Sequence, residues 1–110
     1  MSRSLDQRRT AILTEIAELG PAMPGSLVFR HNRCARPECR CNGDPPQLHG
    51  PYPAWTRKID GKTVTRSLSH AQVDRYQTWF DNARRLHELI DQLRQLAIEQ
   101  AQADGDWPVS

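Results

Sequence analysis

Three cysteines and one histidine lie close together in the middle of this chain. Cys34, Cys39, Cys41 and His49 follow the spacing Cys-x4-Cys-x-Cys-x7-His, and the chain has no other cysteine. Thiolate and imidazole groups are ligands that Zn²⁺ prefers, and four of them complete a structural site. The spacing therefore predicts bound zinc. His31, three residues before Cys34, is a rival to His49, which we prefer because it stands where the loop returns.

The same four residues indicate a structural metal rather than a catalytic one. A catalytic zinc keeps one position open for water or substrate, whereas three thiolates and an imidazole fill all four. The nearby carboxylates, Glu38 and Asp44, are explained as loop residues. The chain has no Gly-rich phosphate loop, paired-carboxylate signature or His-x-x-x-His pair, so we expect no enzyme. The alternative is that the thiols are incidental or redox-sensing.

The segment 27–50 is expected to form a zinc loop with a tight, irregular backbone. Pro37 separates the first two cysteines, and Asn42-Gly43-Asp44-Pro45-Pro46 follows the third. Such residues form turns, and turns allow distant ligands to meet at one ion. The segment has little apolar content, so the metal would supply much of its folding energy.

A two-stranded β-ribbon is predicted over residues 52–68, after a short strand at 27–29. Asp60-Gly61 between β-prone runs is typical of a hairpin turn. Pro51 and Pro53 indicate that the first strand begins at a sheet edge. With a two-residue turn, one face carries Trp55, Arg57, Ile59, Lys62, Val64 and Arg66. A three-residue turn would change these partners, and the sequence does not decide between them.

Helices are predicted at residues 5–19 and 70–101. Ser4 with Gln7, and Ser69 with Gln72, fit capping boxes, and Gly20-Pro21 ends the first helix. The fold class expected is therefore α+β, as one zinc-stapled domain over residues 1–101 with a flexible tail at 102–110.

The second helix carries an apolar heptad seam, with Leu89 and Leu96 beside it. At about 32 residues it is twice as long as the first helix, which leaves part of the seam without a partner. We expect a homodimer or hetero-association through this helix; the alternative is packing within one chain. The seam consists of Trp79, Ala83, Leu86, Ile90, Leu93 and Ala97.

Positive charge is concentrated in the middle of the chain. The net charge is +2, but residues 27–69 hold eight basic and three acidic groups, whereas the flanks are acidic overall. This distribution suits a surface that faces phosphates, although basic strands also block edge-to-edge aggregation. The candidate nucleic-acid-binding residues are Arg30, Arg33, Arg36, Arg40, Arg57, Lys58, Lys62 and Arg66.

The remaining composition favours a cytoplasmic protein without a membrane segment. No run of the 110 residues approaches the roughly 20 apolar residues of a membrane span, and we expect no secretory signal at the N-terminus. In the reducing cytoplasm, clustered thiols bind metal more often than they form disulfides. We expect no small-molecule substrate.

Several motifs together resemble a small bacterial family of unknown function. These are Met23-Pro24-Gly25-Ser26-Leu27-Val28, the cysteine spacing, His49-Gly50-Pro51-Tyr52, Asp60-Gly61-Lys62-Thr63 and Ser67-Leu68, within residues 23–97. The resemblance implies a cysteine knuckle, a hairpin and a C-terminal helix, with zinc at the four ligands. Many members lie beside transposase or other mobile-element genes, which implies a role in DNA transactions. Many also have an aromatic run where this chain has Pro53-Ala54.

We therefore hypothesise a non-enzymatic, zinc-binding, DNA-binding accessory protein of a mobile genetic element. Its basic loop and β-ribbon would contact phosphates, and its helices would dimerise. The alternative is an adaptor whose long helix pairs with a larger enzyme and whose zinc only stabilises the fold. The choice between DNA and RNA stays open.

Overall fold

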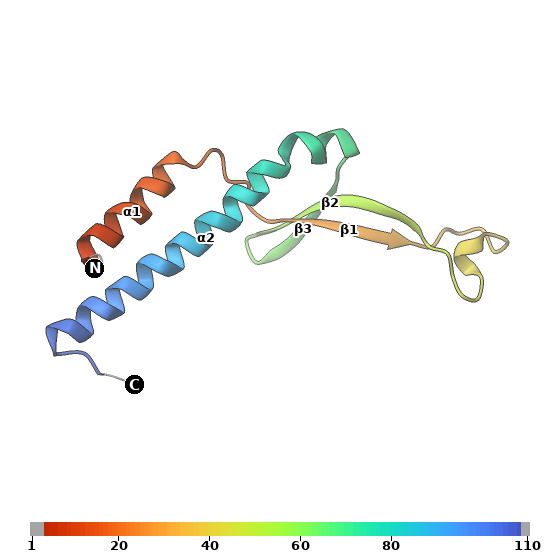
Figure 1. Cartoon of the computed structure of the whole chain (residues 1–110). Helices are drawn as coiled ribbons and strands as arrows, with labels where there is room; N and C mark the ends of the chain where they lie inside the picture. Colours follow the sequence, from red (N-terminus) through yellow and green to blue (C-terminus); the bar gives the residue numbers. More distant parts are fainter. Residues whose placement is uncertain (1–3, 109–110) are drawn as a thin grey trace. The chain divides into compact units, whose positions relative to one another are not determined.

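The computed structural model describes residues 4–108, and the chain divides into two compact units. The helical unit comprises residues 1–23 and 81–110, and the sheet unit comprises residues 24–80. The elements, labelled in Figure 1, confirm the α+β class. In chain order they are α1 (Leu5–Glu18), β1 (Ser26–Asn32), the 3₁₀ helix η1 (Arg40–Asn42), β2 (His49–Ile59), β3 (Lys62–Ser67) and α2 (His70–Asp104).

Both long helices begin at the predicted capping boxes. The Ser4 hydroxyl accepts from the Gln7 N–H at 3.1 Å, and the Gln7 side chain accepts from the Ser4 N–H at 3.0 Å. Ser69 and Gln72 repeat this exchange at the start of α2. Each box satisfies two backbone donors that a helix otherwise leaves unpaired. These local bonds explain why the starts of both helices are readable from the sequence.

Helix α2 ends later than the sequence predicts. It continues to Asp104 rather than 101, because residues 102–104 still favour helix and Gly105 supplies the stop. Gly105 has a φ of 85°, and its N–H donates to the Gln102 carbonyl at 3.1 Å. The predicted tail is therefore helical over its first three residues, while its last two, 109 and 110, lie outside the described residues. No helix within residues 4–108 combines the length and apolarity needed to cross a bilayer.

The core of the helical unit lies between α1 and α2. Ile12, Leu89 and Leu96 are buried there, and Leu5, Ile16, Leu19 and Leu93 pack against them. The buried residues of α2 that face α1 are thus the two leucines that the sequence analysis put beside the seam, and Leu93 of the seam packs against them. The seam itself stays partly exposed within this chain: Trp79, Ala83, Leu86, Ile90 and Leu93 are half-buried, and Ala97 is exposed.

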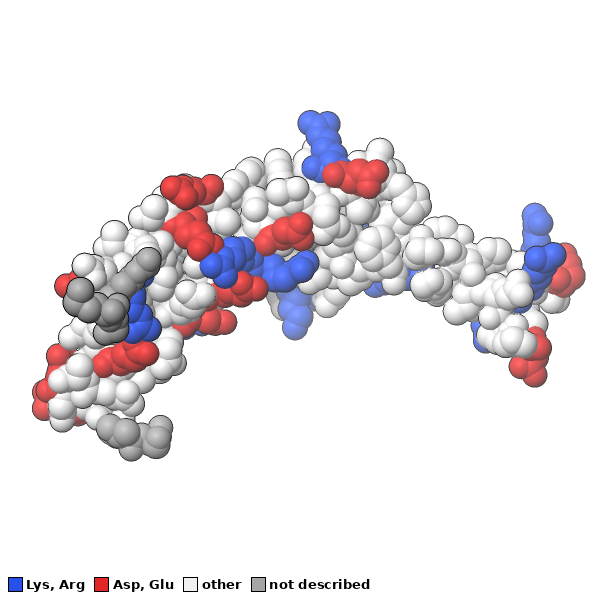
Figure 2. All heavy atoms as spheres, viewed as in Figure 1, with Lys and Arg blue, Asp and Glu red and all other residues white. Residues whose placement is uncertain are grey.

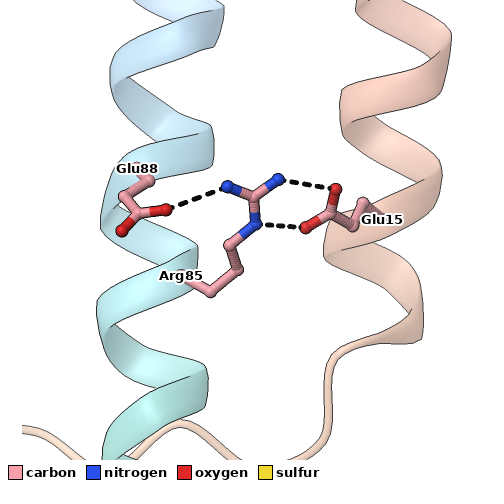
Figure 3. A network of polar contacts seen from close by, with 3 residues as sticks. All are labelled: Glu15, Arg85 and Glu88. Atoms are coloured by element: carbon pink, nitrogen blue, oxygen red, sulfur yellow. Dashed lines mark hydrogen bonds and ion pairs between the residues drawn. The ribbon is translucent and has the colours of Figure 1, made fainter.

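Ion pairs fix how α1 and α2 align. The Arg85 guanidinium donates to both oxygens of Glu15 and, at 2.9 Å, to Glu88 (Figure 3). Arg8 pairs with Glu99 at 2.8 Å. Glu15, late in α1, pairs with Arg85, whereas Arg8, early in α1, pairs with Glu99 further along α2. The two helices therefore run antiparallel. The hydrogen bonds from Arg85 also lower the pKa of the Glu15 carboxyl.

The sheet has one strand more than the two-stranded ribbon predicted. In the part of the chain that is described, β1, β2 and β3 form an antiparallel sheet in that order, so β2 is the central strand. Over residues 49–53, however, β2 pairs with β1 alone because β3 ends at Ser67 opposite Ala54, so the strand begins at a sheet edge as Pro51 and Pro53 indicate. The Pro53 carbonyl accepts from Leu68 N–H at 3.0 Å, so its nitrogen points to the same side, beyond Ser67 at the end of β3. The missing N–H therefore lies opposite Leu68, outside the paired residues of β3.

The hairpin register, which the sequence left open, is that of a two-residue turn. Ile59 pairs with Lys62, and Asp60 and Gly61 have φ angles of 51° and 81°. Positive φ at both positions is the type I′ conformation, whose twist matches that of the strands. With this register, one side of the sheet, here called the tryptophan face, carries Leu27, Phe29, Pro53, Trp55, Arg57, Ile59, Lys62, Val64 and Arg66.

Candidate metal centre

The four ligand candidates converge at the end of the sheet where β1 leaves and β2 returns. Cys34 follows β1, Cys39 directly precedes η1, Cys41 lies within η1, and His49 is the first residue of β2. Their ligand atoms all lie within 4.8 Å of one another, so the cluster could hold a metal ion. His31 is exposed on β1 and does not belong to this group.

Two separations within the cluster match those of ligands around one ion. Four ligands about 2.0–2.3 Å from a tetrahedral zinc lie roughly 3.3–3.8 Å from one another. Here Cys34 Sγ is 3.5 Å from Cys41 Sγ, and Cys39 Sγ is 3.3 Å from His49 Nε2. All three cysteines are free thiols, so no disulfide accounts for the approach. The donor set therefore fits a closed, four-coordinate site.

The cluster favours at least one thiolate before any cation binds. A backbone hydrogen bond from Cys41, with side-chain bonds from Cys34 and Cys41, lowers the pKa of Cys39 to about 6. For Cys41, the Cys34 N–H acts to lower the pKa, but desolvation and the neighbouring thiols together raise it. Three thiolates this close repel one another unless a cation neutralises them. The electrostatics thus suit a divalent metal.

Backbone turns, rather than apolar packing, shape the loop that carries the cysteines. Cys39 N–H donates to the Arg36 carbonyl at 3.2 Å, and Gln47 N–H donates to the Arg40 carbonyl at 3.0 Å. The Cys34 N–H donates to Cys41 Sγ at 3.2 Å, a contact that would hold this ligand in place around a metal. Between residues 33 and 48, Cys41 is the one buried side chain. Such a loop depends on its ligands for rigidity.

Gly50 is a site residue that our sequence reasoning missed. It has a φ of 123°, and a Cβ placed there would lie 2.6 Å from the Arg30 carbonyl oxygen. The register between β1 and β2 shifts here, between Arg30 and Asn32, which is a β-bulge. Glycine thus lets β2 turn close against β1 directly after His49. A non-glycine residue is strained at this φ. The glycine in the His-Gly-Pro run was therefore the sequence signal for a close backbone approach.

The structure spreads the eight basic candidates over three surfaces of the sheet unit. The tryptophan face carries Arg57, Lys62 and Arg66, and the opposite face carries Arg30 and Lys58. The other three lie in the metal loop: Arg33, Arg36 and Arg40. They therefore do not form one patch, although the loop and the tryptophan face each collect three positive charges.

Charge is paired in the helical unit and unpaired in the sheet unit. Along α1 and the adjoining part of α2, acidic and basic side chains are intermixed (Figure 2). The ion pairs found within residues 4–108 all belong to the helical unit, and none involves the eight basic candidates. The sheet unit holds nine basic and four acidic residues, a net charge of +5. Its positive charge is thus available to a partner.

Replacing Gly50 should damage the metal centre more than replacing another glycine with similar backbone strain. Gly50→Ala brings Cβ against the Arg30 carbonyl, whereas Gly61→Ala, at a φ of 81°, meets no atom within 4 Å. We expect Gly50→Ala to weaken metal affinity by about tenfold or more, because ligand supports typically contribute that much. Competition with a chromophoric chelator measures this affinity. An equal loss in both variants would contradict the role assigned to the close backbone approach.

Comparison with known proteins gives a family but no activity. The family described as Domain of unknown function (DUF6788) matches residues 2–78, which include α1, the metal loop, the sheet and the first turns of α2. Neither the curated proteins nor the solved structures contain a match. The match covers most of the chain and the entire cysteine and histidine cluster, and this chain belongs to the DUF6788 family of unknown function.

Proposed function

We propose that this protein is a non-enzymatic zinc protein that binds nucleic acid. The observation that supports this most strongly is the closed cluster of Cys34, Cys39, Cys41 and His49 inside a unit of unpaired positive charge. The four protein ligands leave no position for water or substrate, which favours a structural metal. Zinc is the metal that best suits three sulfurs and one nitrogen.

The metal's role in this proposal is to give the basic loop a fixed outline. Arg33, Arg36 and Arg40 are exposed on the loop, and Arg36 and Arg40 also take part in its turns through their carbonyl groups. A fixed loop loses less conformational entropy when its guanidinium groups bind phosphates. Zinc would thus stabilise the binding surface without contacting the nucleic acid.

DNA is the nucleic acid we propose, in the context of a mobile genetic element. The support for this context is the resemblance carried by the cysteine spacing and His49-Gly50-Pro51-Tyr52. On the face opposite the tryptophan face, Thr56, Thr63, Thr65 and Ser67 add hydroxyl groups beside Arg30 and Lys58, and such groups suit phosphate oxygens.

Protein purified without added metal should contain one zinc per chain. Chelation should abolish this content and make the loop mobile, because few apolar side chains hold it otherwise. Elemental analysis measures the metal, and amide hydrogen exchange over residues 33–48 measures the loop. The helical unit serves as the internal control and should keep its exchange rates. Protein free of transition metal with an equally protected loop would refute the proposal.

DNA affinity should fall steeply with salt. About six phosphate contacts give a log–log slope near −5, or about a 10³-fold loss between 50 and 200 mM salt. Arg57→Ala with Arg66→Ala should reduce both affinity and slope while zinc content stays constant. Titration by fluorescence anisotropy at several salt concentrations measures both quantities.

The matched control for this double variant is Arg84→Ala with Arg94→Ala. It removes the same charge from exposed positions of α2, where each arginine pairs with an aspartate at 3.6 or 3.7 Å. We expect this control to bind DNA almost as the wild type does. If both double variants lost DNA affinity equally, net charge alone would explain the loss, and the sheet would have no specific role in binding.

We further propose that the helical unit pairs with a second copy of itself. In α1, Leu13 lies about 100° around the helix from buried Ile12, and in α2, Ile90 lies about 100° from buried Leu89. Because the helices are antiparallel, both rotations lead to the same side of the pair. This largely apolar side also carries Ile16, Leu86, Leu93 and Ala97, and it includes Arg9, whose guanidinium pairs with Asp6 at 2.8 Å. The side chain of Leu13 is 49% exposed there.

The opposite side of the helical unit is polar. It carries the ion pairs of Arg8 and Arg85 and a groove of about 290 Å³ lined in part by Gln92 and Gln95. The apolar side spans two helices of about 10 Å width and the 14 residues of α1, or roughly 400 Å² in projection. A standard interface buries about 800 Å² of accessible area per partner, and accessible area exceeds projected area because side chains protrude. Two copies facing each other would make a four-helix bundle.

Ile90→Glu should separate this dimer, because it would bury a carboxylate in the apolar interface. Gln92→Glu makes the same charge change on the polar side and should not. Light scattering during size-exclusion chromatography should give about twice 12.6 kDa for the wild type and the control, and 12.6 kDa for Ile90→Glu. A wild type that stays monomeric at high concentration would exclude self-association and favour an adaptor that pairs with another protein.

A further inference from the structure

The tryptophan face combines stacking surfaces with positive charge. Phe29, on β1, is 51% exposed. Beside it, the Arg57 guanidinium lies over the Trp55 ring at 4.5 Å from the ring centroid. Lys62 and Arg66 are exposed on β3 of the same face. We propose that this face binds single-stranded nucleic acid by stacking bases on Phe29 and on the Arg57 guanidinium; the inference rests on the nucleic-acid binding proposed above.

The Arg57 and Trp55 pair forms a prepared flat surface. Trp55 Nε1 donates to the Pro24 carbonyl at 2.7 Å, which fixes the indole ring. The guanidinium lies over this ring, and a guanidinium that lies parallel to a ring leaves its outer plane for a base. Bases stack on arginine planes as they do on aromatic rings. A base would thus extend a stack that the protein has already ordered, which lowers the entropy cost of binding.

The spacing between Phe29 and Trp55, the ring beneath the Arg57 guanidinium, suits neighbouring bases. Phe29 pairs with Pro53, and Trp55 is two residues further along β2, so Phe29 and Trp55 are diagonal neighbours. Such neighbours lie about 7–8 Å apart on one sheet face. Two successive bases of an unpaired, extended strand can reach both surfaces. Bases within a duplex stack on one another and cannot.

Charge on the tryptophan face is complementary to a phosphate backbone. Arg66 pairs across the sheet with Trp55, and Lys62 pairs with Ile59, so positive charge borders the stacking surfaces on β3. The strand residues of this face include no aspartate or glutamate. The exposed apolar groups Phe29 and Ile59 are therefore combined with positive charge alone, which favours a nucleic acid over a protein partner.

The opposite face supplies a matched control. Tyr52 is 47% exposed there, close to the 51% of Phe29. It pairs with Arg30, but the Arg30 guanidinium donates to Thr65 Oγ1 at 3.4 Å rather than stacking on a ring. The two aromatic residues thus match in exposure and both lie where β1 pairs with β2, but they occupy opposite faces.

Phe29→Ala should weaken single-strand binding by about 5- to 150-fold, the effect of losing one stacked base. Tyr52→Ala should change it by less than twofold, and neither variant should change duplex binding. The probes are a labelled oligothymidine and a duplex of equal length, titrated against the full chain by fluorescence anisotropy. Zinc content and far-ultraviolet circular dichroism check that each variant is folded.

A second readout does not depend on the Phe29 variant. In a chain carrying Trp79→Phe and Trp107→Phe, Trp55 is the remaining tryptophan, and oligothymidine should quench its fluorescence while the duplex leaves it unchanged. Equal effects of Phe29→Ala and Tyr52→Ala, or no quenching of Trp55, would overturn the inference. If the inference failed in this way but salt-dependent duplex binding persisted, the proposed function would stand without the single-strand stacking. If neither probe bound, both proposals would fail.

Discussion

Four side chains of the sheet unit meet at one point. Cys34, Cys39, Cys41 and His49 come from a loop, a 3₁₀ helix and the first residue of a strand, and their ligand atoms lie within 4.8 Å of one another. Clustered thiolates repel one another and, without a cation, would open a loop that has almost no buried side chain. A metal that binds them turns this repulsion into the attraction that holds the loop on the sheet.

The sheet gives the loop a fixed base and separates its own side chains by face. The type I′ turn at Asp60 and Gly61 sets the register between β2 and β3, and pairing with β1 makes β2 central. Side chains then alternate, so Arg57 and Trp55 share one face with Arg66, while Arg30 and Tyr52 lie on the other. The loop and the two faces are distinct surfaces, which is why separate variants can test the proposals made for each.

Charge divides the chain in the same way. In the helical unit, Arg8 and Arg85 pair with carboxylates and align α1 with α2, whereas the basic candidates of the sheet unit form no ion pair within residues 4–108. Exposed pairs contribute little to stability, but they neutralise a surface. Unpaired arginines keep their positive potential, which attracts anions over several ångströms. The contrast supports nucleic-acid binding by the sheet unit and association by the apolar side of the helical unit.

Local signals in the sequence determined the candidate ligand cluster, the starts of both helices and the hairpin turn. Each depends on residues close in the chain: the Ser4 and Ser69 capping boxes, Asp60-Gly61, and cysteines spaced so that turns bring them together. Only the tertiary structure decided which of these elements pair or pack with one another. Pairing of β1 with β2, the contact of Leu89 and Leu96 with α1, and the close approach that requires Gly50 all join distant segments. Sequence periodicity gives an apolar face but not what covers it, because that depends on the packing of the whole chain.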